Sequence, residues 1–86
     1  MFRVEYYISN FLVTGYDANG PHHLAVAAKA VAINRSPKQA FARARNAALQ
    51  AYGKSLPTFY YNETGAWTRY RIFRNSQVIK EYDSWM

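Results

Sequence analysis

The dipeptide Ser36-Pro37 is the feature that most limits how this chain can fold. The residue before a proline is pushed out of the helical region, so no helix runs through this point. Serine is a good N-cap and proline is favoured at the first helical position, so a new helix begins here. We predict a helix from about Pro37 to Tyr52, ended by Gly53, because glycine suits the left-handed position that follows a helix.

The predicted helix has an apolar stripe made mostly of alanine. Projection at about 100° per residue places seven side chains on it. They are Ala40, Phe41, Ala44, Ala47, Ala48, Ala51 and Tyr52. A stripe of such small side chains predicts that the helix backbone lies close against a sheet.

The run before the proline, "HHLAVAAKAVAIN", is ambiguous. Its alanines favour a helix. Val31 and Ile33, together with the turn signal "DANGP" just before the run, favour a strand that pairs back on the start of the chain. Because the helix has to begin afresh at Ser36, we predict a strand over about residues 22–33, and a helix there is the alternative.

The remaining segments are typical of strands. Residues 2–8 alternate, with Phe2, Val4, Tyr6 and Ile8 on one face, and the extended segment continues to Tyr16. After the helix come a short strand "TFYYN", a turn "ETG", a strand "AWTRYRIFR", a tight turn "NS" and a last strand "QVIKEYD". The predicted fold class is α+β: an antiparallel β-sheet with one helix packed on one face, order β-β-α-β-β-β, in a single domain of residues 1–86.

Several classes of protein are disfavoured by composition. With no cysteine, the chain has no disulfide, zinc–thiolate site or thiol nucleophile, which fits a reducing compartment. No stretch approaches the roughly 20 apolar residues that span a membrane, so we expect no membrane association. The start "MFRVEYYISNF" lacks the hydrophobic core of a secretory signal, so we expect a cytoplasmic location.

Candidate catalytic groups are few. His22 and His23 are adjacent, and neighbouring side chains on a strand point to opposite faces, so we expect no shared metal ion. No nucleophile-and-base pattern and no phosphate-binding glycine loop occur, so we expect neither enzyme activity nor a cofactor. A small basic ribonuclease, which would use His, Tyr, Arg and Glu without a local motif, remains an alternative.

The net charge of +6 is distributed in acid-free blocks. Between Asp17 and Glu63 there is no acid, and the cations of that interval are Lys29, Arg35, Lys38, Arg43, Arg45 and Lys54. A second block holds Arg69, Arg71, Arg74 and Lys80. Such blocks predict a polyanion or an acidic protein surface as partner. The alternative is a generally basic protein whose charge serves only solubility.

The stretch "WTRYRIFR" combines large rings with arginines. Alternation places Tyr70 and Ile72 toward the helix, since burying arginines without partners would be costly. The other face then forms an outward strip. The predicted partner-binding residues are Trp67, Arg69, Arg71 and Phe73 on this strip, Arg43 and Arg45 on the helix as a second patch, and Arg74 as a further phosphate contact.

The alternative for the same strip is a packing role. Arginine stems lying over Trp67 and Phe73 would be ordinary cross-strand cation–π packing. Glu81 and Asp83 are two residues apart on a strand and so share a face. We expect them to offset the basic strip, and a pair of catalytic carboxylates is the alternative.

Residues 29–70 resemble several small anti-CRISPR proteins that phages and other mobile elements encode. The resemblance rests on the strand "KAVAIN", the Ser-Pro-capped helix "SPKQAFARARNAALQAYG" and the hairpin "FYYNETGAWTRY". It implies an inhibitor in the cytoplasm of a bacterial host that docks on a CRISPR effector complex and blocks DNA binding or nuclease recruitment. Many such inhibitors are acidic DNA mimics. This basic chain would instead bind acidic patches on a protein or bind the nucleic acid itself.

Two functional hypotheses follow. The first is a non-catalytic inhibitor that binds a protein complex through the basic aromatic strip. The second is a basic nucleic-acid-binding module that contacts phosphates and bases with arginine and aromatic side chains. A homodimer formed by edge pairing of the small sheet is compatible with either hypothesis.

Overall fold

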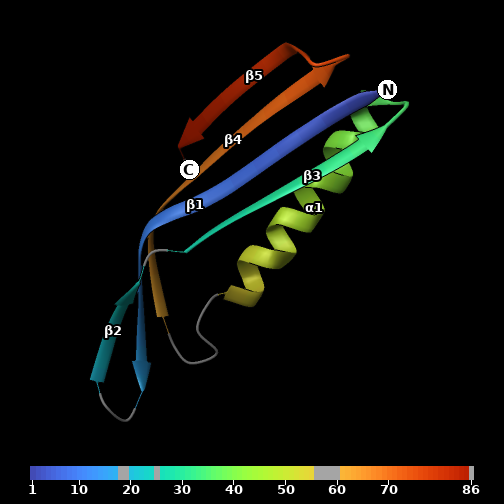
Figure 1. The fold of residues 1–86 in the computed structure, drawn as a ribbon. Helices are drawn as coiled ribbons and strands as arrows, with labels where there is room; N and C mark the ends of the chain where they lie inside the picture. Colours follow the sequence, from blue (N-terminus) through green and yellow to red (C-terminus); the bar gives the residue numbers. More distant parts are fainter. Residues whose placement is uncertain (18–19, 25, 56–60, 86) are drawn as a thin grey trace.

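The computed structural model describes residues 1–17, 20–24, 26–55 and 61–85, and it describes side chains for residues 1–9, 26–55 and 67–83. The elements are β1 (Phe2–Asp17), β2 (Gly20–Leu24), β3 (Ala27–Asn34), α1 (Pro37–Ser55), β4 (Tyr61–Arg74) and β5 (Gln77–Trp85). Figure 1 shows α1 on one side of a sheet in which β5, β4, β1 and β3 lie side by side.

The sheet is antiparallel throughout and four strands wide. The long strand β1 pairs with β4 along one edge. Along its other edge it pairs with β3 through residues 2–9 and with β2 through residues 13–17. Because β2 and β3 follow one another along the same edge, they occupy one position in the sheet. The predicted α+β class is confirmed, and the order reduces to β-β-α-β-β.

The predicted order contained one strand too many. The expected turn "ETG" is absent, because β4 runs without interruption from Tyr61 to Arg74. Glu63 and Thr64 pair with Val13 and Leu12 of β1, so the long neighbouring strand offers partners on both sides of Gly65. The first residues of the expected short strand, 58–60, lie outside the described part of the chain.

In its described residues the ambiguous run before the helix is strand rather than helix, as predicted. Its first residues belong to β2, which begins earlier, at Gly20, and its last eight residues form β3. In β3 the exposed and half-buried side chains alternate, with Ala28, Ala30 and Ala32 packed against the core. Alternation of small inward residues with Lys29, Val31 and Ile33 outward explains why the alanines here do not form a helix.

The helix begins at Pro37 as predicted. The backbone N–H of Gln39 donates to Ser36 Oγ at 3.3 Å, which is the expected N-cap bond. The predicted end is wrong, because α1 continues through Gly53 to Ser55. The Ser55 hydroxyl donates to the carbonyl of Ala51 at 3.0 Å, which gives the last turn a hydrogen bond that needs no left-handed glycine.

The core lies between α1 and the inward face of β1 and β3. Ala40, Ala44 and Ala48 are buried against Val4, Tyr6 and Ile8. Two members of the predicted stripe, Ala47 and Ala51, are exposed instead. The stripe is turned toward Phe41, whose ring packs edge-on against Tyr70 with a centroid distance of 4.8 Å.

The hairpin between β4 and β5 fixes which side chains share a face. Its turn is formed by Asn75 and Ser76, which both have positive φ, as in the two-residue turns that favour hairpins. A bulge follows, because Phe73 pairs with Val78 while Ile72 pairs with Lys80. The extra residue, Ile79, places Lys80 and Tyr82 on the same side of the sheet as α1, and Glu81 and Asp83 on the other side.

Candidate functional site

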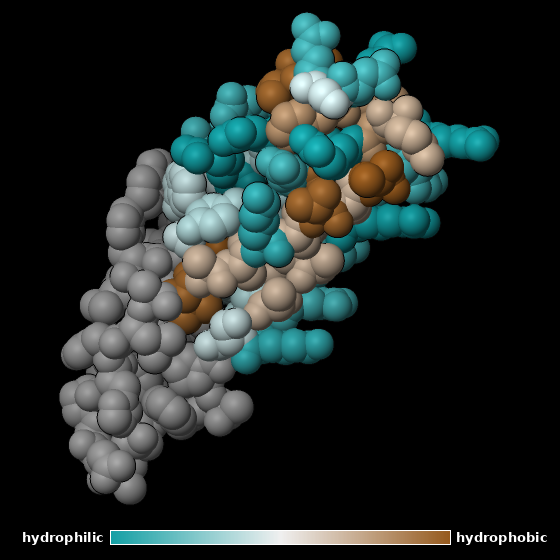
Figure 2. Space-filling view, in the orientation of Figure 1, coloured by the Kyte–Doolittle hydropathy of each residue, from teal (hydrophilic) through white to brown (hydrophobic). Residues whose placement is uncertain are grey.

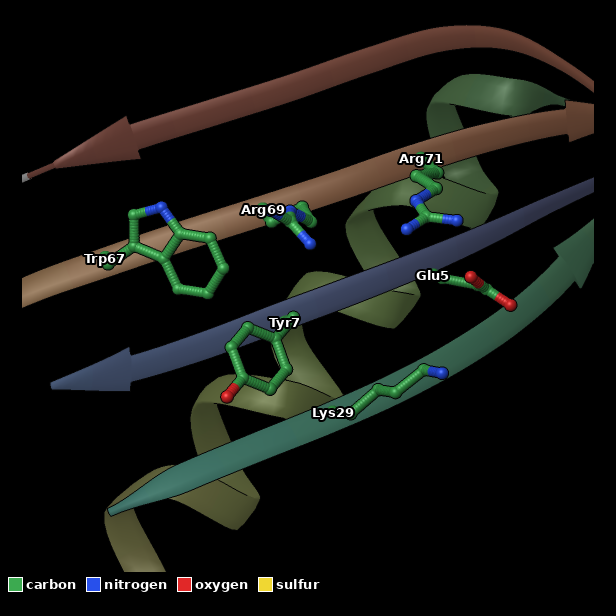
Figure 3. Close-up of a pocket in the computed structure, with 6 residues that line it drawn as sticks. All are labelled: Glu5, Tyr7, Lys29, Trp67, Arg69 and Arg71. Atoms are coloured by element: carbon green, nitrogen blue, oxygen red, sulfur yellow. The ribbon is translucent and has the colours of Figure 1, made fainter. Parts of the chain in front are cut away.

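The face of the sheet turned away from α1 carries the strip that the sequence singled out, and we call it the open face. Two rows of side chains cross it in register. One row is Lys29, Tyr7, Arg69 and Asp83, and the other is Val31, Glu5, Arg71 and Glu81. Figure 3 shows six of the residues on this face in front of the strands, with α1 behind them.

Both arginines of the strip have acidic partners on β5. Arg69 Nε lies 2.7 Å from Asp83 Oδ1, and Arg71 Nε lies 3.4 Å from Glu81 Oε1. The hydrogen bond that Arg69 donates to Asp83 raises the pKa of Arg69 above its ordinary value. An arginine is already charged at physiological pH, so the raised pKa changes nothing in its charge. The expectation that Glu81 and Asp83 offset the basic strip is confirmed.

The rings of the strip are also partnered. Trp67 packs edge-on against Tyr7 with a centroid distance of 5.2 Å, and the Arg69 guanidinium lies 4.8 Å from the Trp67 ring centroid. Arg3, opposite Phe73 in register, places its guanidinium 4.2 Å from that ring. Phe73 lies on the open face, as predicted, but Arg3 covers its ring, and Phe73 is only 9 % exposed. The cross-strand packing alternative describes these contacts well.

The open face contains a depression of about 260 Å³ lined by Glu5, Tyr7, Lys29, Trp67, Arg69 and Arg71 (Figure 3). The charges of the open face nearly cancel. Among the described side chains, four cations on this face, Arg3, Lys29, Arg69 and Arg71, stand against three acids, Glu5, Glu81 and Asp83. A polyanion therefore meets little net attraction here.

The opposite side of the molecule is strongly basic. All three acids whose side chains the structure describes lie on the open face, so the described part of the helix side has none. The cations on that side are Lys38, Arg43, Arg45 and Lys54 of α1, Arg74 of β4 and Lys80 of β5. Figure 2 shows long hydrophilic side chains projecting along the margin where α1 lies. Among the described side chains, the net positive charge is thus concentrated on one side.

Part of the helix side forms a step. The helix packs over β3 and β1, which leaves the same face of β4 and β5 beside it rather than beneath it. We call this step the helix-side shelf and define it by Lys38, Phe41, Arg45, Tyr70, Lys80 and Tyr82. Lys38 and Arg45 are three and four residues from Phe41, so they share the flank of α1 that Phe41 turns toward Tyr70.

The floor of the shelf is aromatic. Tyr70 and Tyr82 stack with a centroid distance of 5.4 Å and an interplanar angle of 28°. The ammonium of Lys80 lies 5.9 Å from the Tyr70 ring centroid. Tyr82, on the edge strand, is 49 % exposed. Cations and rings are therefore adjacent here without a described acid among them.

The predicted site residues are distributed over four places. Trp67, Arg69, Arg71 and Phe73 are together on the open face. Arg45 lies on the shelf, whereas Arg43, two residues earlier, lies on the other flank of α1. Arg74 is at the end of β4, with its guanidinium 5.8 Å from the Phe2 ring centroid.

Sequence reasoning missed most of the shelf. The sequence identifies Lys38 only as one cation of an acid-free block, and it assigns Tyr70 only to the core. A two-residue hairpin without a bulge would place Lys80 opposite Arg71 and Glu81 opposite Tyr70. The bulge at Ile79 exchanges these faces, and nothing in "NSQVIKEYD" shows a bulge by itself.

No family model, curated protein or solved structure matches this chain. Within the described residues, no group of three or more His, Asp or Glu side chains gathers as a metal site would require. In the same part of the chain, no helix is long and apolar enough to cross a membrane. The argument for function therefore depends on the distribution of charge and rings.

Proposed function

We propose that this chain is a non-catalytic nucleic-acid-binding protein that contacts phosphates through the helix-side shelf. One observation carries the proposal. The three acids whose side chains are described lie on the open face, where Glu81 and Asp83 pair with arginines, and the cations of the other side have no described acid near them. Clustered unpaired cations attract a polyanion and release its counterions on binding.

The shelf supplies three of these cations, Lys38 and Arg45 from α1 and Lys80 from β5. Strand β5 pairs with β4, whose Tyr70 contacts Phe41 of α1. Aromatic side chains next to such cations are typical of surfaces that bind nucleic acid with little sequence preference. The proposal therefore predicts binding governed by phosphate contacts and salt.

The test is fluorescence anisotropy with labelled DNA and RNA over a series of salt concentrations. With three phosphates neutralised, log affinity should fall against log salt with a slope of about −2 for single strands. Arg45→Gln should weaken binding and bring the slope nearer to zero by about 0.7. Lys29→Gln removes the same charge from the open face and should leave both quantities near those of the unmodified chain.

The proposal fails if no nucleic acid binds at moderate salt, or if affinity does not respond to salt. It also fails if Lys29→Gln weakens binding as much as Arg45→Gln does, because the phosphates would then lie on the open face.

A second candidate function is an inhibitor of the anti-CRISPR type that docks on a nucleic-acid-processing effector complex. The open face favours it. That face combines the depression, the rings of Tyr7 and Trp67 and nearly balanced charge with exposed apolar side chains, since Val31 is 50 % and Ile33 59 % exposed. Aromatic and arginine side chains with apolar neighbours are typical of protein interfaces.

The second candidate predicts tight, stoichiometric binding to a CRISPR effector complex through the open face. Trp67→Ala should weaken that binding by about 2 kcal/mol or more if the ring is a hot spot. Binding is measured by surface plasmon resonance on the purified complex, with Lys54→Gln on the helix side as the control. If the original chain and Trp67→Ala bind the complex with equal affinity, the open face is ruled out as the docking surface.

A further inference from the structure

Three tyrosine rings form a stack that crosses the sheet on the helix side. Tyr6 of β1 and Tyr70 of β4 are 6.3 Å apart between centroids with an interplanar angle of 4°, and Tyr82 of β5 continues the stack. Phe41 of α1 closes it from above, with edge-on contacts to Tyr6 and Tyr70. The inner end is fixed in the core, because Tyr6 is buried.

The outer end of the stack is half exposed. Tyr82 lies on the edge strand, and its exposed fraction of 49 % is large for a ring that only fills space between neighbours. Its ring orientation is set by Tyr70 beneath it, so little conformational entropy is lost when something stacks on it. Tyr82 therefore offers a rigid aromatic surface that another flat ring can cover.

The charges around this ring suit a phosphate backbone. Lys80 is on the same face of β5, two residues before Tyr82, and Arg45 and Lys38 lie on the neighbouring flank of α1. A nucleotide whose base covers Tyr82 would have its phosphate beside these cations. Among the described side chains, no acid lies on this side of the sheet to repel it.

We propose that the helix-side shelf binds single-stranded nucleic acid in preference to duplex, with one base stacked on Tyr82; this inference rests on the function proposed above. A base inside a duplex is covered by its own neighbours and cannot present its face to a side chain. An unpaired base can, and stacking on aromatic side chains is tolerant of sequence because every base has such a face.

The test compares Tyr82→Leu, which removes the ring but keeps an apolar side chain, with the matched control Tyr82→Phe, which keeps the ring. Both are titrated by anisotropy into a labelled single strand of about 12 nucleotides and into the duplex of the same sequence. The single strand should bind the unmodified chain more tightly than the duplex does. Tyr82→Leu should weaken single-strand binding about tenfold, with Tyr82→Phe near the unmodified chain and duplex binding little changed.

The inference is overturned if Tyr82→Leu binds the single strand as tightly as the unmodified chain does, or if single strand and duplex lose affinity equally. Circular dichroism of each variant establishes that the fold is retained. The two proposals fail in different ways. Binding that depends on Arg45 but not on Tyr82 rules out only the base stacked on Tyr82. Absence of binding to any nucleic acid rules out both the stacked base and the proposed function.

Discussion

Ala44 of α1 belongs to the core between the helix and the sheet, with 0 % of its surface exposed. Ala44→Leu adds three carbon atoms where there is no room, so it should lower the free energy of unfolding by about 1–3 kcal/mol. Urea denaturation followed by circular dichroism measures the change. Ala47→Leu is the matched control, because Ala47 is on the same helix but exposed, and its effect should stay within about 0.5 kcal/mol.

The reverse result, with Ala47→Leu the more damaging variant, would mean that the helix is rotated relative to the sheet. The choice between these alanines could not be made from the sequence. The projection of α1 identified Ala40, Ala44 and Ala48 correctly, but small side chains on both margins left the centre of the stripe undetermined. The contact of Phe41 with Tyr70 determines the rotation, and that contact joins segments far apart in the chain.

At the scale of the element, a substitution of Gly53 tests where α1 ends. The structure places it within the last turn, and a Cβ added there would meet nothing within 4 Å. Gly53→Ala should therefore raise the free energy of unfolding by about 0.5–1 kcal/mol, because alanine loses less entropy in a helix. Thermal and urea denaturation measure it. Destabilisation would instead place Gly53 in the left-handed conformation that the sequence suggested.

The elements themselves were predictable to different degrees. Ser36-Pro37 located the start of α1, and alternation located β1, most of β4 and β5, because these signals are local. The continuity of β4 through Gly65 and the bulge at Ile79 were not predictable, since each depends on what the neighbouring strand offers. The partners of Arg69 and Arg71 follow from that bulge. It brings Asp83 and Glu81 opposite the arginines, where opposite charges are favourable.

At the scale of the whole molecule, the two sides of the sheet differ in charge. The sequence correctly indicated acid-free blocks, but it assigned the partner-binding role mainly to the arginines of β4. Two of them, Arg69 and Arg71, share a face with the described acids. Among the described side chains the unbalanced charge therefore lies on α1, Arg74 and Lys80 instead. Such a division allows one small chain to present a basic surface on one side and a nearly neutral, partly apolar surface on the other.

The most direct measurement is a titration of the isotopically labelled chain with a short single-stranded oligonucleotide, followed by ¹H–¹⁵N correlation spectra. The account predicts that the largest shifts occur at Lys38, Arg45, Lys80 and Tyr82, with little change in the indole N–H signal of Trp67 on the open face. Shifts centred on Trp67, Tyr7 and Lys29, with α1 unchanged, would contradict it and assign nucleic-acid binding to the open face.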